Sequence, residues 1–241
     1  MKILCVSDQI DPLIYNQNAV KTFPDIDLIL CAGDLPMDYV DFIVSTFNKP
    51  TYFIFGNHNL TEYRYYHKNK APLPAQFQFA PPGASMPAGH GAVYAGFRVI
   101  RDNKLSFLDP ATGKMTPLLI AGVSGSLRYN NGLNQYTDKQ MHNCLAHLVP
   151  SLILNKIRYG RYLDILLTHA SPRHVHDQED PCHKGFDSFN WFIKKFKPAY
   201  LVHGHIHLYD MRKERITKVE DTTVVNAYAH CVLDFPQEQK K

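Results

Sequence analysis

The stretch of sequence that decides the fold is Tyr200-Leu201-Val202-His203-Gly204-His205-Ile206-His207. Its apolar beginning predicts a short buried strand, and three histidines follow within five residues. Because side chains alternate along an extended strand, these histidines would share one face. Gly204 allows the backbone a sharp turn or a close approach to another group. Since imidazole is the commonest metal ligand among side chains, the stretch indicates a metal site. The alternative is a polar strand end with solvated histidines.

Four earlier apolar runs also end in polar side chains. The runs are 2–7, 28–32, 51–55 and 163–167, and shortly after them come Asp8, Asp34, Asn57 with His58, and His169. In open α/β sheets, ligands bind outside the carboxyl ends of the strands. We therefore expect these side chains to meet the histidines of the 203–207 stretch at one edge of the fold.

The expected ligands combine carboxylates, a carboxamide and imidazoles. This mixture of oxygen and nitrogen donors suits Mn, Fe, Zn, Co or Ni better than Ca or Mg. A carboxylate between two such cations can bridge them at roughly 3.5–4 Å. A bridged pair generates hydroxide at neutral pH and clamps a phosphoryl group for in-line attack.

Composition limits the class of protein. The chain has 241 residues, of which 45% are hydrophobic and 20% charged, and its net charge is +4. These values are typical of a globular protein with one sizeable α/β domain, and the mild charge favours neither a nucleic-acid nor a membrane partner. Five cysteines without a Cys-x-x-Cys motif favour a reducing compartment. No apolar run reaches membrane-spanning length, and the N-terminal run is too short for a signal sequence, so we predict a cytoplasmic protein.

The rest of the chain predicts alternating strands and helices in a single domain spanning 1–241. The expected helices cover 18–23, 39–47 capped by Asp38, 138–149, a further stretch to 159 that Pro150 starts or kinks, and 186–196. The expected strands include a hairpin or meander over 92–108, a buried strand over 118–123, and a closing antiparallel pair over 222–227 and 231–235.

Residues 60–90 interrupt this rhythm with many aromatic residues and prolines. A loop of this length in a compact domain is usually functional or disordered, and its aromatic content argues against disorder. We predict an insertion that lies near the site, and a packed surface excursion is the alternative.

The polar strand ends resemble a known family. Gly33-Asp34, Gly56-Asn57-His58, a lone His169 after a buried strand, and Gly204-His205-Ile206-His207 are similar to the motifs of the calcineurin-like metallophosphoesterases, which read D-x-H, GD, GNH, H and GHxH. Each motif is weak alone, but the ordered set over residues 8–207 is specific. The resemblance implies a four-layer α/β/β/α sandwich with mixed central sheets.

The resemblance also implies a role for each matching residue. Two divalent transition-metal ions would be held by the strand-end residues: Asp34 as the bridge, Asn57, His169 and His205 at one ion, and Asp8 and His207 at the other. His58 would hydrogen-bond the phosphoryl oxygen or protonate the leaving group.

The first motif departs from the family pattern, because it reads Asp8-Gln9-Ile10. Isoleucine cannot ligate a metal, so we expect weaker binding at the Asp8 site, a shifted metal preference or a mononuclear enzyme. Gln9, Asp11 or water could take the vacant position, and the sequence leaves the three open. A smaller departure is Asn59, where relatives often carry an acid.

The expected function is hydrolysis of a small phosphate ester by attack of a metal-bound hydroxide on phosphorus. A diester is favoured over a monoester because the family contains many phosphodiesterases. Arg128 can meet a phosphate in a bidentate manner, and His183, with Asp177 and Asp180, can lie at the rim. A surface arginine and a solvated loop are the alternatives. His203 is expected behind the ligands rather than among them.

Two other functions are compatible with the same motifs. A non-catalytic protein-binding scaffold, as in the retromer subunit with this fold, is suggested by Ile10, although retention of the other predicted ligands argues against it. A nuclease of the same superfamily would show a basic groove or an appended DNA-binding domain, which the modest charge and short length disfavour.

Overall fold

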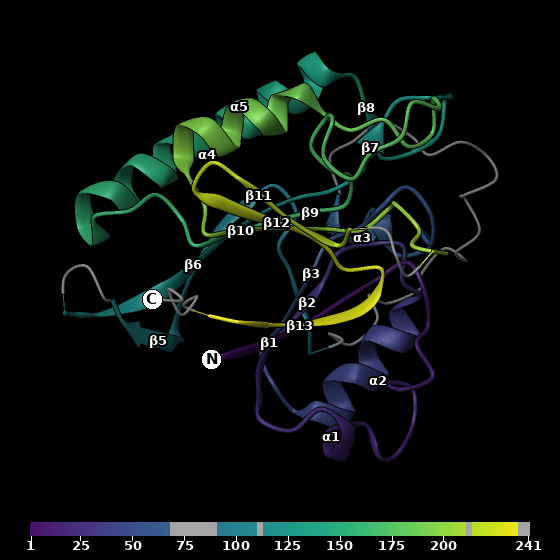
Figure 1. The fold of residues 1–241 in the computed structure, drawn as a ribbon, viewed down its shortest axis with the longest axis vertical. Helices are drawn as coiled ribbons and strands as arrows, with labels where there is room; N and C mark the ends of the chain where they lie inside the picture. The colour runs from purple at the N-terminus through teal and green to yellow at the C-terminus, as the bar shows by residue number, and fades with distance from the viewer. Residues whose placement is uncertain (68–90, 110–112, 211–213, 236–241) are drawn as a thin grey trace.

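The structure is a computed structural model that describes residues 1–67, 91–109, 113–210 and 214–235. The described strands form two large sheets and one small ribbon (Figure 1). The first sheet has the order β13-β1-β2-β3-β4 and consists of β1 (Lys2–Ser7), β2 (Ile26–Cys31), β3 (Thr51–Phe53), β4 (Val93–Tyr94) and β13 (Ala229–Asp234).

The second sheet has the order β11-β12-β10-β9-β6-β5. Its strands are β5 (Arg98–Leu108), β6 (Met115–Val123), β9 (Ile165–Thr168), β10 (Tyr200–His203), β11 (Ile216–Val219) and β12 (Thr222–Asn226). The ribbon pairs β7 (Ser126–Leu127) with β8 (Gln135–Tyr136). Both large sheets are mixed, because parallel inner strands are flanked by antiparallel β13 in the first sheet and by antiparallel β11 and β5 in the second.

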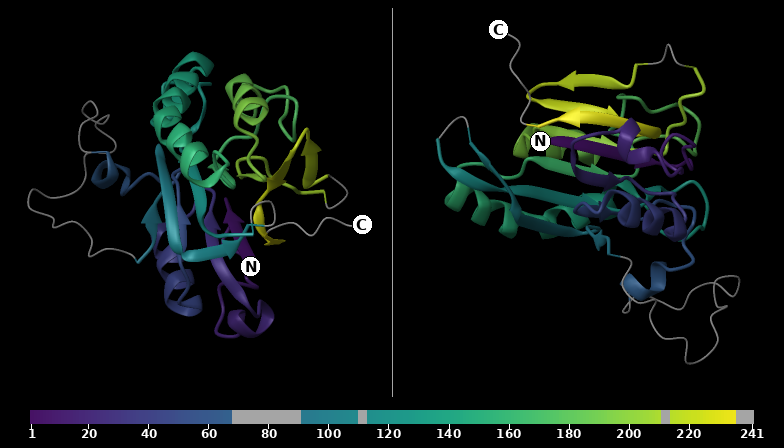
Figure 2. Two further views of the ribbon diagram at one scale, coloured as in Figure 1. Left: turned by 90° about the vertical axis from the view of Figure 1, so that its left-hand side faces the viewer. Right: turned by 90° about the horizontal axis from the view of Figure 1, so that it is seen from below.

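Helices cover the outer face of each sheet (Figures 1 and 2). On the first sheet pack α1 (Ala19–Thr22), α2 (Met37–Phe47) and α3 (Tyr63–Tyr66). On the second sheet pack α4 (Asp138–Tyr159) and α5 (Asp187–Phe196). The layers therefore run helix, sheet, sheet, helix, which confirms the predicted four-layer α/β/β/α sandwich.

Strand β1 shows why the inner strands read as continuous apolar runs. Ile3 and Cys5 point into the core between the two sheets, whereas Leu4 and Val6 point the other way, into the core beneath α2. A strand covered on both faces has no solvent side, so both sets of alternating side chains must be apolar.

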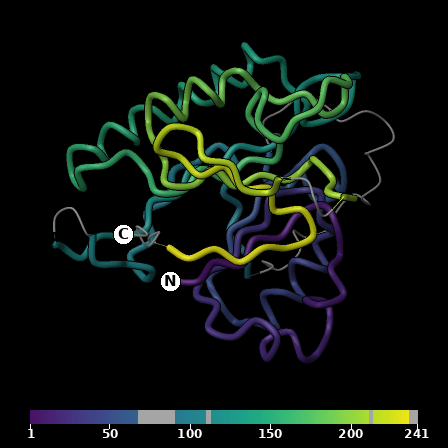
Figure 3. Tube along the Cα trace, viewed as in Figure 1, coloured from purple at the N-terminus to yellow at the C-terminus, as the bar shows by residue number. Residues whose placement is uncertain are grey.

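Parallel pairing also explains where the polar strand ends meet. Strands β1, β2 and β3 run in one direction in the first sheet, and β6, β9, β10 and β12 are mutually parallel in the second. From the N-terminus, β1 runs toward the side of the molecule where the loops gather (Figure 3). The residues that follow β1, β2, β9 and β10 consequently approach one another.

Two predictions about strand pairing were wrong. The closing strands do not pair with each other: β12 lies beside β10 in the second sheet and β13 beside β1 in the first. Strand β12 is buried throughout, as an inner strand must be, whereas β13 is partly exposed and forms an edge. Likewise, residues 92–108 make no hairpin of their own, because β4 pairs with β3 and β5 pairs with β6.

The observed helices differ from the predicted ones in smaller ways. One continuous helix, α4, passes through Pro150 instead of ending there, and Thr137 and Gln140 form a capping box at its start. Asp38 lies in the first turn of α2, whose N-cap residue is Pro36, so the prediction that Asp38 caps this helix was wrong. Within the predicted insertion over 60–90, the structure describes α3, and residues 68–90 lie outside the described part.

Candidate metal centre

Several residues after the strands adopt a left-handed backbone. The φ angles are 64° at Asp8, 55° at Asp34 and 67° at His205. Such angles cost roughly 1–3 kcal/mol for a residue with a Cβ atom and persist where the surrounding structure enforces them, commonly at functional sites. Here each one turns the chain sharply at the carboxyl end of a strand.

Asp34 and His169 bring the two sheets together. His169 Nδ1 donates to the carbonyl oxygen of Ala32 at 2.9 Å, which leaves Nε2 directed at Asp34 Oδ2 at 3.3 Å. Burial disfavours the ionised Asp34, but His169 and the His58 N–H outweigh it and lower the pKa of this carboxyl to about 2. Burial also disfavours the imidazolium, but Asp34 outweighs it and raises the pKa of His169 to about 9. A cation at this position would compete with the Nε2 proton, because metal ligands bind deprotonated.

His205 and Asn57 lie against this pair. His205 Nε2 donates to the carbonyl oxygen of Cys182 at 2.7 Å, which leaves Nδ1 as the lone-pair nitrogen. Burial, and next the charge of His169, lower the pKa of His205 to about 4, so its ring is neutral at physiological pH. Asn57 Oδ1 lies 3.2 Å from His169 Nε2.

Asp34, His169 and His205 form a buried group whose ligand atoms all lie within 4.8 Å of one another. Gly56 leaves the necessary room, because a Cβ atom there would overlap Asp34 Oδ1 and lie only 2.5 Å from His169 Nε2. One carboxylate and two imidazoles, with a carboxamide oxygen adjacent, fit a divalent transition metal. A search of the described residues for carboxylate, imidazole and thiol groups spaced as in a metal site finds these three residues.

Asp8 and His207 lie next to this group in a less complete arrangement. His207 Nε2 is 3.7 Å from Asp8 Oδ1. The Asp8 carboxylate also accepts the His205 N–H, at 3.1 and 2.9 Å to its two oxygens, and a hydrogen bond from Ser7 Oγ. His207 Nδ1 contacts Tyr209 Oη at 2.5 Å. The Asp8 carboxylate thus already anchors the 204–207 turn to β1.

Comparisons with known proteins agree with this geometry. A family model described as calcineurin-like phosphoesterase matches residues 1–209. The chain belongs to this family. The match confirms the predicted family. Members of the calcineurin-like phosphoesterase family hydrolyse phosphoric esters and use divalent metals. The comparison with curated proteins found no match. Among the described residues, no helix is long and apolar enough to cross a membrane.

Solved structures share the fold at low identity. One aligns with a TM-score of 0.61 and 15% identity, covering 97% of this chain and 94% of its own. TT1561 of Thermus thermophilus aligns with a TM-score of 0.57 and 16% identity, covering 94% and 88%. Wild-type Vps29 of Entamoeba histolytica complexed with Zn²⁺ aligns with a TM-score of 0.38 and 12% identity, covering 95% of this chain and 74% of its own.

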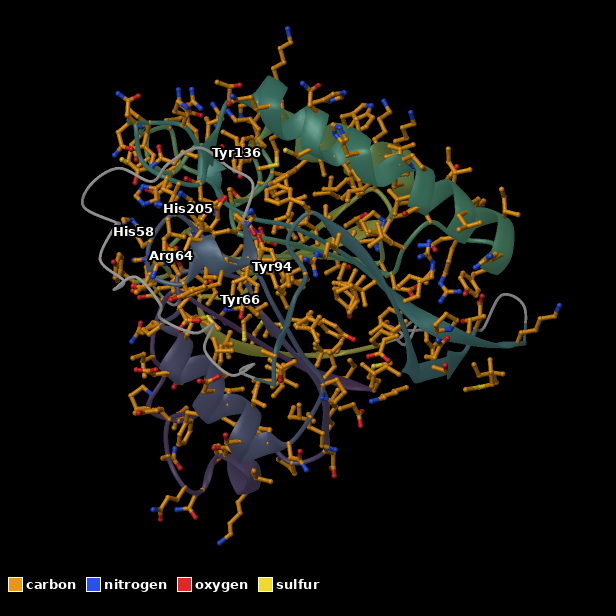
Figure 4. All side chains as sticks on the ribbon, turned by 180° about the vertical axis from the view of Figure 1, so that it is seen from behind. His58, Arg64, Tyr66, Tyr94, Tyr136 and His205 are labelled. Carbon is orange, nitrogen blue, oxygen red and sulfur yellow. The ribbon has the colours of Figure 1, made fainter. Side chains whose placement is uncertain are left out.

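The family's GNH motif places His58 at the edge of the site. Its backbone N–H donates to Asp34 Oδ1 at 2.7 Å while the residue itself is exposed. His58 and His205 lie on the same side of the molecule (Figure 4). Asn59 donates through Nδ2 to the carbonyl oxygen of Asp34 at 2.9 Å. His58 and Asn59 therefore hold Asp34 by its side chain and by its backbone.

The residues beside Ile10, which stands where the family motif has histidine, differ in exposure and in hydrogen bonding. Ile10 is 43% exposed and Gln9 is exposed beside it. The Asp11 carboxylate is engaged elsewhere, since it accepts from Leu13 N at 2.8 Å and contacts His230 Nδ1.

Three further predicted residues lie at different distances from the centre. Arg128 donates to Gln140 Oε1 at 3.2 Å. His183 Nδ1 contacts Asp180, and its ring centroid lies 5.4 Å from that of His205. His203 is fully buried behind the site, and its two nitrogens contact His176 Nδ1 and the Gly204 carbonyl oxygen.

Sequence reasoning missed two groups at the site. The carbonyl oxygen of Cys182 selects the His205 tautomer, and a backbone carbonyl has no sequence signature. Tyr129 Oη accepts from Asn57 Nδ2 at 3.1 Å. The available signal was the polar loop over 124–136, which follows a buried strand in the same way as the other site loops.

Replacing Asp34 with asparagine should remove the metal. The carboxamide keeps the size but loses the charge, so protein purified from metal-supplemented medium should hold at least tenfold less Mn or Zn per chain by elemental analysis. Asp221→Asn, at an exposed carboxylate paired with Lys197, is the matched control. Wild-type metal content in the Asp34→Asn protein would contradict the prediction and show that binding does not need the Asp34 charge.

Proposed function

We propose that this protein is a metal-dependent phosphoesterase that hydrolyses a phosphodiester or a phosphomonoester of a small molecule, with diesters favoured. The observation that carries the proposal is the buried group of Asp34, His169 and His205 beside the exposed imidazole of His58. Family membership supports phosphoric ester hydrolysis at the general level. The choice of diester extends beyond it and rests on the family's many phosphodiesterases.

The proposed ligands divide into a stronger and a weaker set. Asp34, Asn57, His169 and His205 would hold the first ion, which is Mn, Fe, Ni, Co or Zn. Asp8 and His207, with Asp34 as the bridge, would hold a second ion of the same kind. Because Ile10 supplies no donor and Asp8 already accepts hydrogen bonds from His205 N, the second ion would be the weaker. Bound metal supplies Lewis-acid activation of the ester and of the attacking water.

His58 is the proposed proton donor. Its backbone is fixed by the hydrogen bond to Asp34 Oδ1, whereas its exposed ring can approach a substrate bound over the ligands. A histidine in this position can donate a hydrogen bond to a phosphoryl oxygen or a proton to the leaving alkoxide. The inner side chains would hold the metal, and the outer side chain would donate the proton.

His58→Ala should lower kcat for bis-p-nitrophenyl phosphate by about 10²- to 10⁴-fold, the range for loss of a general acid. Metal content should remain near the wild-type value, because the backbone N–H that binds Asp34 is retained. His147→Ala, at an exposed histidine of α4, is the control for loss of an imidazole. Loss of metal together with activity would show that His58 is a ligand and not a proton donor.

Ile10→His restores the family's first motif and should strengthen the second site. Titration with Mn²⁺ should show a second binding event, or at least a tenfold tighter one, since an imidazole adds a donor beside Asp8 and His207. Leu13→His places a histidine at another exposed position in the same loop and should have no such effect. An unchanged titration of Ile10→His would mean that other groups already complete that site.

A further inference from the structure

We infer that Tyr129 is a positioning residue for the metal centre: its phenol oxygen orients the Asn57 carboxamide so that the carboxamide oxygen faces the ion. Tyr129 belongs to the loop over 124–136, and neither the sequence motifs nor family membership assigns it a role. The inference rests on the proposed metal site and concerns how that site is built.

A carboxamide has two faces of opposite character. Its oxygen carries lone pairs and can ligate a cation, whereas its nitrogen carries two hydrogens and cannot. A rotation of 180° about the last side-chain bond exchanges the two atoms with little change in shape. A bound cation favours the orientation with the oxygen toward it, and an acceptor for the amide hydrogens stabilises that orientation further.

Tyr129 is placed to supply this acceptor. Asn57 Nδ2 donates to Tyr129 Oη at 3.1 Å, and Asn57 Oδ1 then lies 3.2 Å from His169 Nε2, on the side of the metal group. Asn57 is only 8% exposed, so its amide hydrogens depend on protein acceptors. In the reversed orientation the carboxamide nitrogen would face the cation, and a donor would be directed at a positive charge.

The loop that carries Tyr129 is fastened to the segment that carries Asn57. Asn134 Nδ2 donates to the carbonyl oxygens of Gly56 at 2.6 Å and Phe55 at 3.3 Å, and Gly125 N donates to Phe55 O at 3.0 Å. Phe55 N donates in return to Ser124 Oγ at 3.3 Å. These bonds fix the relative position of the two segments at residues adjacent to Asn57.

A second contact between a tyrosine and an asparagine holds this loop, with the hydroxyl as the donor. Tyr136 Oη donates to Asn134 Oδ1 at 3.0 Å, so the Asn134 nitrogen is the atom that faces the carbonyl oxygens of residues 55 and 56. Tyr136 lies on the same side of the molecule as His58 and His205 (Figure 4). Tyr136 thus orients Asn134 toward the segment that carries Asn57.

Hydrogen bonds within the loop hold the Tyr129 backbone. The main-chain N–H groups of Tyr129 and Asn130 both donate to Gln135 Oε1 at 3.3 Å, and Gln135 is itself buried. A phenol on a backbone held in this way can hold Asn57 in one orientation. Groups that orient metal ligands typically contribute 10- to 100-fold to metal affinity.

The test is a double-mutant cycle read out as Mn²⁺ affinity by isothermal titration, which does not require activity. Tyr129→Phe should raise the Kd about 10- to 100-fold, because the acceptor that selects the orientation is lost. Asn57→Asp makes both ends of the side chain oxygen, so adding Tyr129→Phe in that background should change the Kd by less than about threefold. Tyr15→Phe, at an exposed tyrosine, is the control, and thermal unfolding checks the fold of each variant.

Two results would overturn the inference. An unchanged Kd for Tyr129→Phe would show that Asn57 needs no such partner. An equal loss of affinity in the wild-type and Asn57→Asp backgrounds would show that the phenol supports the loop without selecting an orientation. Failure of the proposed function looks different, because in that case wild-type protein itself would bind no Mn²⁺.

Discussion

The contact between Asp34 and His169 is the interaction on which the rest of this site depends. Asp34 follows β2 of one sheet and His169 follows β9 of the other, and the imidazole bridges from the Ala32 carbonyl oxygen to the carboxylate. Burying a carboxylate is costly unless it is paired and hydrogen-bonded. Here His169 of the other sheet pairs with the Asp34 carboxylate and offsets that cost. The fold therefore holds a charged oxygen where a cation could bind.

A second set of hydrogen bonds also links strand ends of the two sheets, at β1 and β10. His205 N donates to the Asp8 carboxylate and Gly204 N donates to the His169 carbonyl oxygen, so the turn after β10 is tied both to β1 and to the turn after β9. Gly204 is required for this approach, since a Cβ atom there would overlap Ser7 Oγ. The glycines of the motifs therefore allow close packing at the site.

The sequence was sufficient to predict that Asp34, His169 and His205 lie together, because each follows an apolar run and parallel strands bring such positions to one edge. The sequence was insufficient to predict which strands pair, because strand pairing depends on packing between segments far apart in the chain. The last two strands, β12 and β13, are neighbours in the chain but join different sheets, and only their burial distinguishes an inner strand from an edge strand. Tyr129 and the Cys182 carbonyl oxygen were missed because their roles arise from loop geometry, which leaves no periodic pattern.

The central claim is that this fold holds a transition metal which hydrolyses phosphate esters. Its most direct test is elemental analysis of the purified wild-type chain, paired with hydrolysis of bis-p-nitrophenyl phosphate and p-nitrophenyl phosphate over added Mn, Fe, Co, Ni and Zn. The account predicts at least one ion per chain and metal-dependent turnover, faster with the diester. Folded protein that neither retains metal nor hydrolyses either ester with any of these ions would contradict it and favour a protein-binding scaffold.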